Sequence, residues 1–159
     1  MKLNQVVAAT VLAGCASAAH GVGCNVASSG AVFGTYTPGQ ALPKDTTGNI
    51  TVNCTKGTLD VLPLTVTYTI DLSRGNSSSY APRELKNGGN TLLYNLYTGP
   101  LRSSVWGSAA NGMQVSGSLL LTVVSGSGSA IHPAYGRIFA NQNATPGAYS
   151  DSIVITINY

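Results

Sequence analysis

The side chains that could perform acid–base chemistry are few in this 159-residue sequence. Beyond residue 18 they are five carboxylates and two histidines: Asp45, Asp60, Asp71, Glu84, Asp151, His20 and His132. General acid–base catalysis needs such groups in pairs at a reacting bond, and no two of these stand in a recognisable catalytic arrangement. His132 precedes Pro133, which is typical of an exposed loop histidine, and the serines lack a nucleophile elbow. We therefore predict no catalytic residue and a protein that is not an enzyme.

The three cysteines, Cys15, Cys24 and Cys54, are the other reactive side chains. If Cys15 is removed with a leader, the remaining two are expected to form a disulfide in an oxidising compartment. That bridge would close a loop of about 31 residues and would stabilise the fold by roughly 3–4 kcal/mol. Two unpaired buried thiols are the alternative. No histidine or further cysteine stands at metal-ligand spacing, so we predict no metal site and no cofactor.

The N-terminal residues have the pattern of an export signal. Met1-Lys2 is positively charged, Val6 to Ala13 is apolar, and Ala16-Ser17-Ala18 is a small-x-small cleavage site. Residues 1–18 are therefore predicted to be a signal peptide and residues 19–159 the mature domain. No other apolar run approaches the ~20 residues of a membrane span. We expect export to the periplasm and then to the cell surface or the medium.

A second interpretation of the same leader stays open. Leu12-Ala13-Gly14-Cys15 has the residue order of a bacterial lipoprotein signal. Cys15 would then carry the lipid, and the protein would be anchored to the outer membrane.

Composition excludes one large class of partner and indicates the fold class. Only 8% of the residues are charged, and the net charge of +3 becomes +2 without Lys2. With no basic block, the sequence does not predict a nucleic-acid surface. Nineteen glycines accompany many Ser, Thr and Asn residues, whereas Glu, Lys and Gln are scarce. This composition favours strands joined by tight turns over helices.

The alternation of apolar and polar residues predicts where the strands lie that would position any functional site. The sequence predicts seven or eight short strands, at residues 31–37, 48–55, 62–72, 82–86, 91–98, 113–124, 135–141 and 148–159. Asn87-Gly88-Gly89-Asn90 between two of them is a strong hairpin signal. The last two are expected to pair across residues 144–147, and Val32 is expected on the alternating positions of the first. Short strands at this spacing predict a single-domain β-sandwich.

The last strand is the most informative. Its Ile153, Ile155, Ile157 and Tyr159 fall on one face, and polar residues and Val154 fall on the other. A strand that ends a chain needs a partner or a protected edge, because an exposed edge is a template for another chain. We therefore expect function at this edge.

Several motifs in order along the chain resemble one known family, the spore coat protein U domain. The motifs are Phe33-Gly34-Thr35-Tyr36, residues 48–54, residues 68–75, residues 92–97 followed by Trp106-Gly107, residues 135–138 and residues 147–151. The resemblance covers residues 24–159. It implies an immunoglobulin-like β-sandwich that lacks one strand, found in secreted coat proteins and in pilus subunits of archaic chaperone-usher systems.

The resemblance also implies partners and a binding mode. A periplasmic chaperone would first fill the gap in the sandwich. After passage through an outer-membrane usher, a neighbouring pilin-like subunit would replace the chaperone by strand addition. Ile153, Ile155, Ile157 and Tyr159 would form the strand-exchange interface.

One departure from the fibre-forming pattern affects the expected role. A donor strand needs roughly ten alternating residues at ~3.3 Å each, yet cleavage after Ala18 leaves residues 19–23 before Cys24. We therefore expect an acceptor, as a tip, cap or stand-alone subunit, rather than a donor.

The alternative function is a monomeric adhesive or carbohydrate-binding module. It would need exposed aromatic side chains gathered at one end, for which the sequence offers Trp106, Tyr94, Tyr97 and Tyr135. Packing of these rings in the core is the favoured interpretation.

Overall fold

The computed structural model describes residues 21–57, 60–111 and 113–159. The predicted leader, Cys15 and His20 lie outside these residues. The described residues form eight strands and a short 3-10 turn at Ala109–Asn111. The strands are β1 Val22–Ser28, β2 Lys44–Lys56, β3 Leu64–Leu72, β4 Arg83–Asn87, β5 Asn90–Tyr97, β6 Val115–Leu121, β7 Ser127–Ile138 and β8 Ile155–Asn158.

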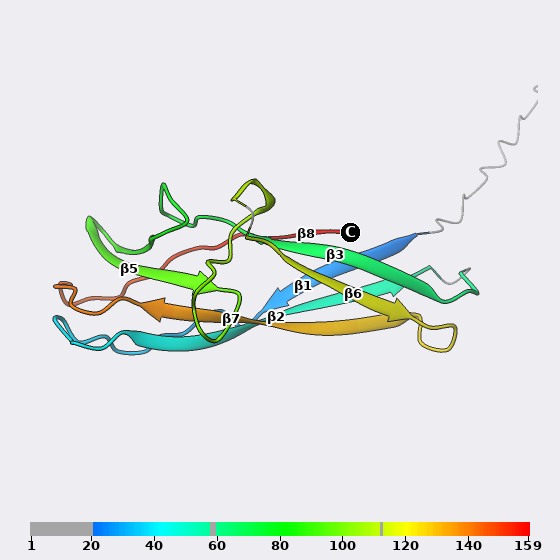
Figure 1. Ribbon diagram of the computed structural model, residues 1–159, viewed down its shortest axis with the longest axis horizontal. Coiled ribbons are helices and arrows are strands. Elements are labelled where there is room, and N and C mark those ends of the chain that lie inside the picture. Colours follow the sequence, from blue (N-terminus) through cyan, green and yellow to red (C-terminus); the bar gives the residue numbers. More distant parts are fainter. Residues whose placement is uncertain (1–20, 58–59, 112) are drawn as a thin grey trace, which may run out of the picture.

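All strand pairs are antiparallel and they form two sheets. One sheet has the order β1-β2-β7-β5-β4 and the other has the order β6-β3-β8 (Figure 1). This arrangement confirms the predicted all-β sandwich. No helix of the described residues is long and apolar enough to span a membrane.

Period-two alternation explains the strands that the sequence located well. In β3, Val66, Tyr68, Ile70 and Leu72 are buried, and the threonines between them face outward. The hairpin of β4 and β5 turns at Gly88, whose φ of 57° suits glycine. Cys24 and Cys54 face each other in the register of β1 and β2 and form the predicted disulfide, which is thereby confirmed.

The prediction of a first strand at residues 31–37 is wrong. The first strand is β1, and residues 31–37 are an irregular segment. Gly30 and Gly34 each have a φ of 69°, and these left-handed positions interrupt an extended strand. Within this segment Val32 is 77% exposed, while Ala31 and Phe33 turn inward.

The final strand is shorter than predicted and has a different partner. β8 covers four residues and pairs with β3, so β7 and β8 lie in different sheets rather than pairing with each other. The chain before β8 crosses between the sheets. Ser150 bridges to Lys86 of β4, and four residues later Val154 bonds to Ser73 beyond the end of β3. This crossing interrupts the ladder that continuous alternation predicts.

The two ends of the sandwich are built differently. In the closed half, β3, β6 and β8 cover β1 and the adjoining parts of β2 and β7 (Figure 1). In the open half, β4, β5 and the remaining parts of β2 and β7 form a sheet whose inner face has no second sheet over it. Two irregular segments, residues 30–36 and residues 144–154, lie there instead.

Candidate functional site

An apolar groove runs along the open half between those two segments. It encloses about 1020 Å³, at the upper end of the ~300–1,000 Å³ typical of small-molecule sites. Its floor is the inner face of the larger sheet, with Leu72 at the end of β3. The floor residues are Ile50, Leu72, Leu85, Leu92, Tyr94, Leu96, Ala134 and Ile138. We call residues 30–36 the N-wall and residues 144–155 the C-wall.

The N-wall is attached to the sheet by side chains. Its residues 30–36 make no backbone–backbone hydrogen bond to the described residues. Thr46 Oγ1 donates to the Val32 carbonyl at 2.7 Å. The Phe33 ring packs edge-on against Tyr94, with 5.8 Å between centroids, and lies where a Cβ on Gly136 would stand. The N-wall therefore presents unpaired main-chain groups beside the groove.

Tyr36 fastens the far end of the N-wall. Its hydroxyl donates to the Phe139 carbonyl at 3.2 Å and accepts from the Gln142 amide at 3.0 Å. The Gln142 side chain in turn bonds both main-chain groups of Leu93, at 2.7 and 2.8 Å, as a neighbouring strand would. These bonds join the N-wall to the turn that follows β7 and to β5.

The C-wall is anchored at three places. Ser150 exchanges backbone hydrogen bonds with Lys86, Val154 exchanges two bonds with Ser73, and β8 then pairs with β3. β8 is the last strand of its sheet, so the edge that faces away from β3 pairs with no described strand. An open strand edge of this kind can accept another strand.

Asp151 is the single carboxylate among the groove-lining residues. One of its oxygens accepts from the Tyr94 hydroxyl at 2.6 Å, and the other accepts from the Asn76 and Ser152 amides at 2.7 Å. Burial, together with the bond to Asp151, raises the pKa of the Tyr94 hydroxyl. Tyr94 therefore stays a proton donor at physiological pH.

Comparisons with known proteins identify the family. The model of the Spore Coat Protein U domain matches residues 4–156. This chain belongs to the Spore Coat Protein U domain family. Protein U of Myxococcus xanthus is 30% identical to it over 135 residues, which are 80% of this chain and 70% of that protein.

A solved structure shares the fold of this Spore Coat Protein U domain. It is a chain from the crystal structure of the CsuC–CsuE chaperone–tip adhesion subunit pre-assembly complex, from archaic chaperone-usher Csu pili of Acinetobacter baumannii. The TM-score is 0.58 at 16% identity, over 87% of this chain. The match spans 40% of the solved chain. The predicted immunoglobulin-like sandwich is thus confirmed at the level of fold.

The four predicted interface residues of this Spore Coat Protein U domain divide into two groups. Ile153 and Ile155 line the groove. Ile157 is half-buried against the core but does not line the groove, and Tyr159 is 58% exposed and lies outside it. The predicted alternation of faces is correct, since Val154 between the two groove residues is 64% exposed.

Sequence reasoning missed the deepest charged side chain of the domain. Arg83 is fully buried and donates to the carbonyls of Ser73 and Trp106 and to Asn95 Oδ1, at 2.7–3.1 Å. Burial lowers the pKa of its guanidinium, and the nearby Tyr94 and Asp151 act in the opposite direction. Arg83 fixes Ser73, which holds the C-wall. Its position in a short polar strand gave no signal of this burial.

The candidate aromatic surface is not present at the predicted residues. Trp106, Tyr94 and Tyr97 are 0%, 3% and 8% exposed, and the Trp106 indole donates to the Ile70 carbonyl at 3.0 Å. Tyr135 is half-buried, with the Arg102 guanidinium 5.8 Å from its ring centroid. The interpretation of these rings as core residues is the one that their burial supports.

His132 is the clearest error among the titratable residues. It lies in β7 rather than in an exposed loop, and its Nε2 is 2.8 Å from the Tyr68 hydroxyl of the opposite sheet. Burial lowers the pKa of His132. Pro133, which suggested the loop, pairs with Asn49 of β2, whereas the pairing of β7 with β5 covers residues 135–138, so on that side of Pro133 there is no ladder partner among the described strands to lose. No group of three metal-ligating side chains occurs among the described residues.

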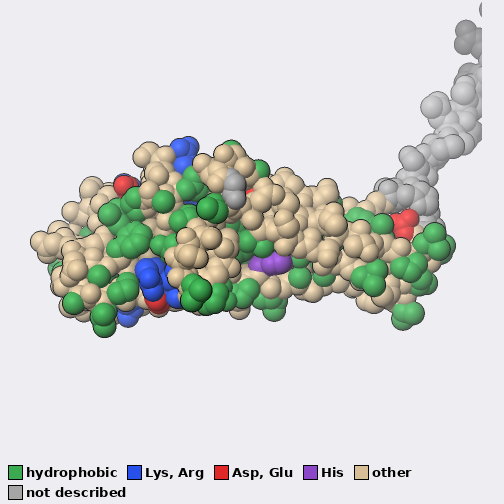
Figure 2. Space-filling view, in the orientation of Figure 1, with side chains coloured by type: hydrophobic (Ala, Val, Ile, Leu, Met, Phe, Trp, Pro, Cys, Tyr) green, Lys and Arg blue, Asp and Glu red, His purple; other side chains and the backbone are tan. Residues whose placement is uncertain are grey.

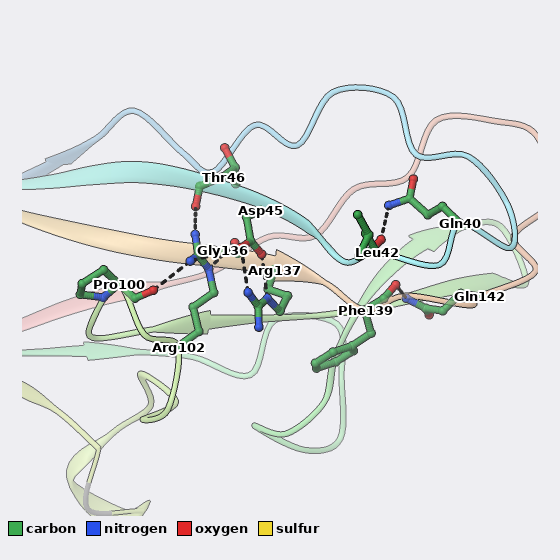
Figure 3. A network of polar contacts seen from close by, with 10 residues as sticks. All are labelled: Gln40, Leu42, Asp45, Thr46, Pro100, Arg102, Gly136, Arg137, Phe139 and Gln142. Atoms are coloured by element: carbon green, nitrogen blue, oxygen red, sulfur yellow. Dashed lines mark hydrogen bonds and ion pairs between the residues drawn. The ribbon is translucent and has the colours of Figure 1, made fainter.

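The strongest charge network lies outside the groove (Figure 3). Arg137 donates to both carboxylate oxygens of Asp45, at 2.7 and 2.8 Å, and Arg102 lies 3.2 Å from one of them. The Arg137 hydrogen bond, followed by the two positive charges, lowers the pKa of Asp45. Arg102 also donates to the Gly136 carbonyl at 3.3 Å, which holds the loop after β5 against the sheet. Charged side chains are otherwise sparse on the face drawn in Figure 2.

Proposed function

We propose that the groove accepts a β-strand from another polypeptide, and that this domain is a pilin-like or coat subunit assembled by donor-strand complementation. The observation that carries the proposal is an apolar floor flanked by two walls with unpaired main-chain edges. An inserted strand would bond to these edges and place alternate side chains on the floor. The groove supports the proposal of an acceptor role.

The comparisons support the class of partner. The family is named for a spore coat protein, and the fold match comes from a complex of a chaperone with a pilus tip subunit. We infer that a periplasmic chaperone occupies the groove during export and that a neighbouring pilin-like subunit replaces it at an outer-membrane usher. The domain would then reach the cell surface or the medium, with lipidation at Cys15 as the anchored alternative.

The chemistry of the groove favours a strand over a small polar substrate. Its lining carries no Lys, Arg, His or Glu, and the one carboxylate, Asp151, already accepts three hydrogen bonds. Acid–base catalysis would need a second titratable group facing Asp151 across a substrate. We therefore propose a structural, non-enzymatic role.

The test uses the protein purified from the periplasm and a synthetic peptide of about ten residues, the length that spans ~33 Å when extended. The peptide alternates apolar and polar side chains. We expect the protein made without a chaperone to be poorly soluble or strand-swapped, and the peptide to restore a soluble monomer. A stable monomer that ignores the peptide contradicts the proposal.

A pair of neighbouring substitutions locates the binding surface. Ile153→Asp places a carboxylate in the apolar groove and should weaken peptide binding by at least about 100-fold, because burying an unpaired charge costs several kcal/mol. Val154→Asp is the matched control, since Val154 faces solvent. Titration calorimetry of both variants gives the comparison. Equal binding by the two variants would place the peptide elsewhere.

A further inference from the structure

We infer that Tyr94 and Asp151 are positioning residues that hold the C-wall in its strand-accepting place before any partner arrives. The inference rests on the proposed function for its binding test. It gives a role to the Tyr94–Asp151 hydrogen bond, the polar contact inside an otherwise apolar groove. Strand addition alone does not explain why this contact is there.

Asp151 lies in a stretch of the C-wall that the backbone anchors weakly. Residues 151–153 lie between the Ser150 and Val154 anchors and make no backbone–backbone hydrogen bond to the described residues. Ile153, which lines the groove, is in this stretch. The side chain of Asp151 is what ties the stretch to the rest of the domain, through Tyr94 and the Asn76 amide.

The surrounding residues fit closely around the Asp151 carboxylate. A Cβ on Gly75 would stand 2.1 Å from Asp151 Oδ2, so only glycine lets the loop after β3 approach so closely. Gly75 also has a φ of 66°, which suits glycine. The Tyr94 hydroxyl reaches the carboxylate from the floor, and Tyr94 is 3% exposed. Three elements thus converge on one side chain: β5, the loop after β3 and the C-wall.

The energetic consequence is preorganisation. A hydrogen bond from a hydroxyl to a carboxylate is stronger than one between two neutral groups. If the clamp is lost, the C-wall samples other positions, and the affinity for a strand falls by the fraction of time that the wall is out of place. Because the folded domain already orders the C-wall, the partner strand does not lose binding free energy in ordering it.

The test compares Tyr94→Phe with Tyr80→Phe. Tyr94→Phe keeps the ring that forms the floor and removes only the hydroxyl bonded to Asp151. Tyr80→Phe is matched, because the Tyr80 hydroxyl also makes one side-chain hydrogen bond, to Ser108 at 3.1 Å, outside the groove. We expect Tyr94→Phe to raise the Kd for the alternating peptide about tenfold, in line with loss of a charged hydrogen bond, and Tyr80→Phe to leave it within about twofold.

Hydrogen exchange separates positioning from general stability. In the peptide-free protein, the Ser152 and Val154 amides, which donate to Asp151 Oδ1 and Ser73 Oγ, should exchange about tenfold faster in Tyr94→Phe than in the wild type. Asp151→Asn is the second variant and should act in the same direction. Unchanged exchange and unchanged Kd in both variants would overturn the inference, as would a loss of stability that leaves the Kd unaltered.

Failure of the inference differs from failure of the proposed function. If the wild type binds no alternating peptide, strand acceptance is refuted, and the exchange of the Ser152 and Val154 amides still decides whether Tyr94 and Asp151 hold the wall. If the wild type binds and the two variants match it, strand acceptance stands and the clamp is refuted.

Discussion

The closed and open halves bury apolar side chains to a similar extent by different means. In the closed half, Val52 and Leu121 are fully buried between paired strands of two sheets. In the open half, Leu92 and Ile138 are 3% and 2% exposed, although irregular segments and a groove lie over them. Low exposure of single residues therefore does not show that a layer is complete. The difference lies in the backbone, which is paired over the first half and unpaired along the walls of the second.

A matched pair of leucines should give the largest difference between the halves. Leu121→Ala leaves a closed cavity and should lower the free energy of unfolding by about 4 kcal/mol, whereas Leu92→Ala enlarges an existing groove and should cost about 2 kcal/mol. Of the two variants, only Leu92→Ala should weaken binding of the alternating peptide, because Leu92 lines the groove. Urea unfolding and peptide titration measure both effects. Equal costs would mean that the groove is packed shut in solution.

The disulfide should matter for stability and not for the groove. Replacing Cys24 and Cys54 by alanine releases a loop with a sequence separation of 30 residues. The chain-entropy model predicts a loss of about 3–4 kcal/mol in unfolding free energy. Because the bridge lies in the closed half, the Kd for the peptide should stay within about twofold at temperatures where the variant is folded. A large change in Kd would show that the halves are coupled.

Acidification should destabilise the closed half first, through His132. Burial lowers the pKa of His132 from 6.5, so the unfolded chain binds the proton more tightly than the folded one. The stabilisation is complete above pH 6.5 and is lost as the pH falls through the lower folded value. Because His132 is partly exposed, solvent screening keeps this loss small, below about 1 kcal/mol. Urea midpoints from pH 7.5 to pH 5 measure it, and His132→Gln should flatten the profile.

Protonation of Asp45 in the open half should give the smallest loss of stability, and it should do so at lower pH than His132. The pKa of Asp45 is lowered from 3.8, chiefly by Arg137. The contribution of this pair is complete above pH 3.8 and is lost as the pH falls through the lower folded value. Because the Asp45 side chain is 36% exposed, solvent screening keeps the contribution below about 1 kcal/mol. Asp45→Asn should remove this acid limb and leave the His132 limb intact.

The sequence predicted the closed half better than the open half. Strict alternation located β3, because a period-two signal repeats along the strand. The disulfide was predicted because an expected export leaves Cys24 and Cys54 as the two cysteines of the mature domain. The irregular walls follow from long-range contacts. Phe33 packs on Gly136, and Tyr36 bonds to residues more than a hundred positions away. Gly30 and Gly34 were the local signal that argued against a first strand at residues 31–37.

The terminal segment shows the same limit. Alternation correctly divided the faces of residues 153–158, yet it could not reveal that the chain leaves β4 at Ser150 and joins β3 after Val154. The roles of Tyr94, Asp151 and Arg83 were likewise invisible, since each depends on partners from other elements. Of the candidate interface residues, Ile153 and Ile155 line the groove and Tyr159 lies outside it, and their role in strand exchange stays a prediction.

Hydrogen–deuterium exchange of the wild-type protein, with and without the alternating apolar peptide, tests strand acceptance most directly. The account predicts that the peptide slows exchange of the main-chain amides in residues 31–36 of the N-wall and residues 151–155 of the C-wall. Residues 22–28 and 115–121, the edge strands of the closed half, should exchange at unchanged rates. Slowed exchange at those edge strands, or no change at the walls, would contradict the account.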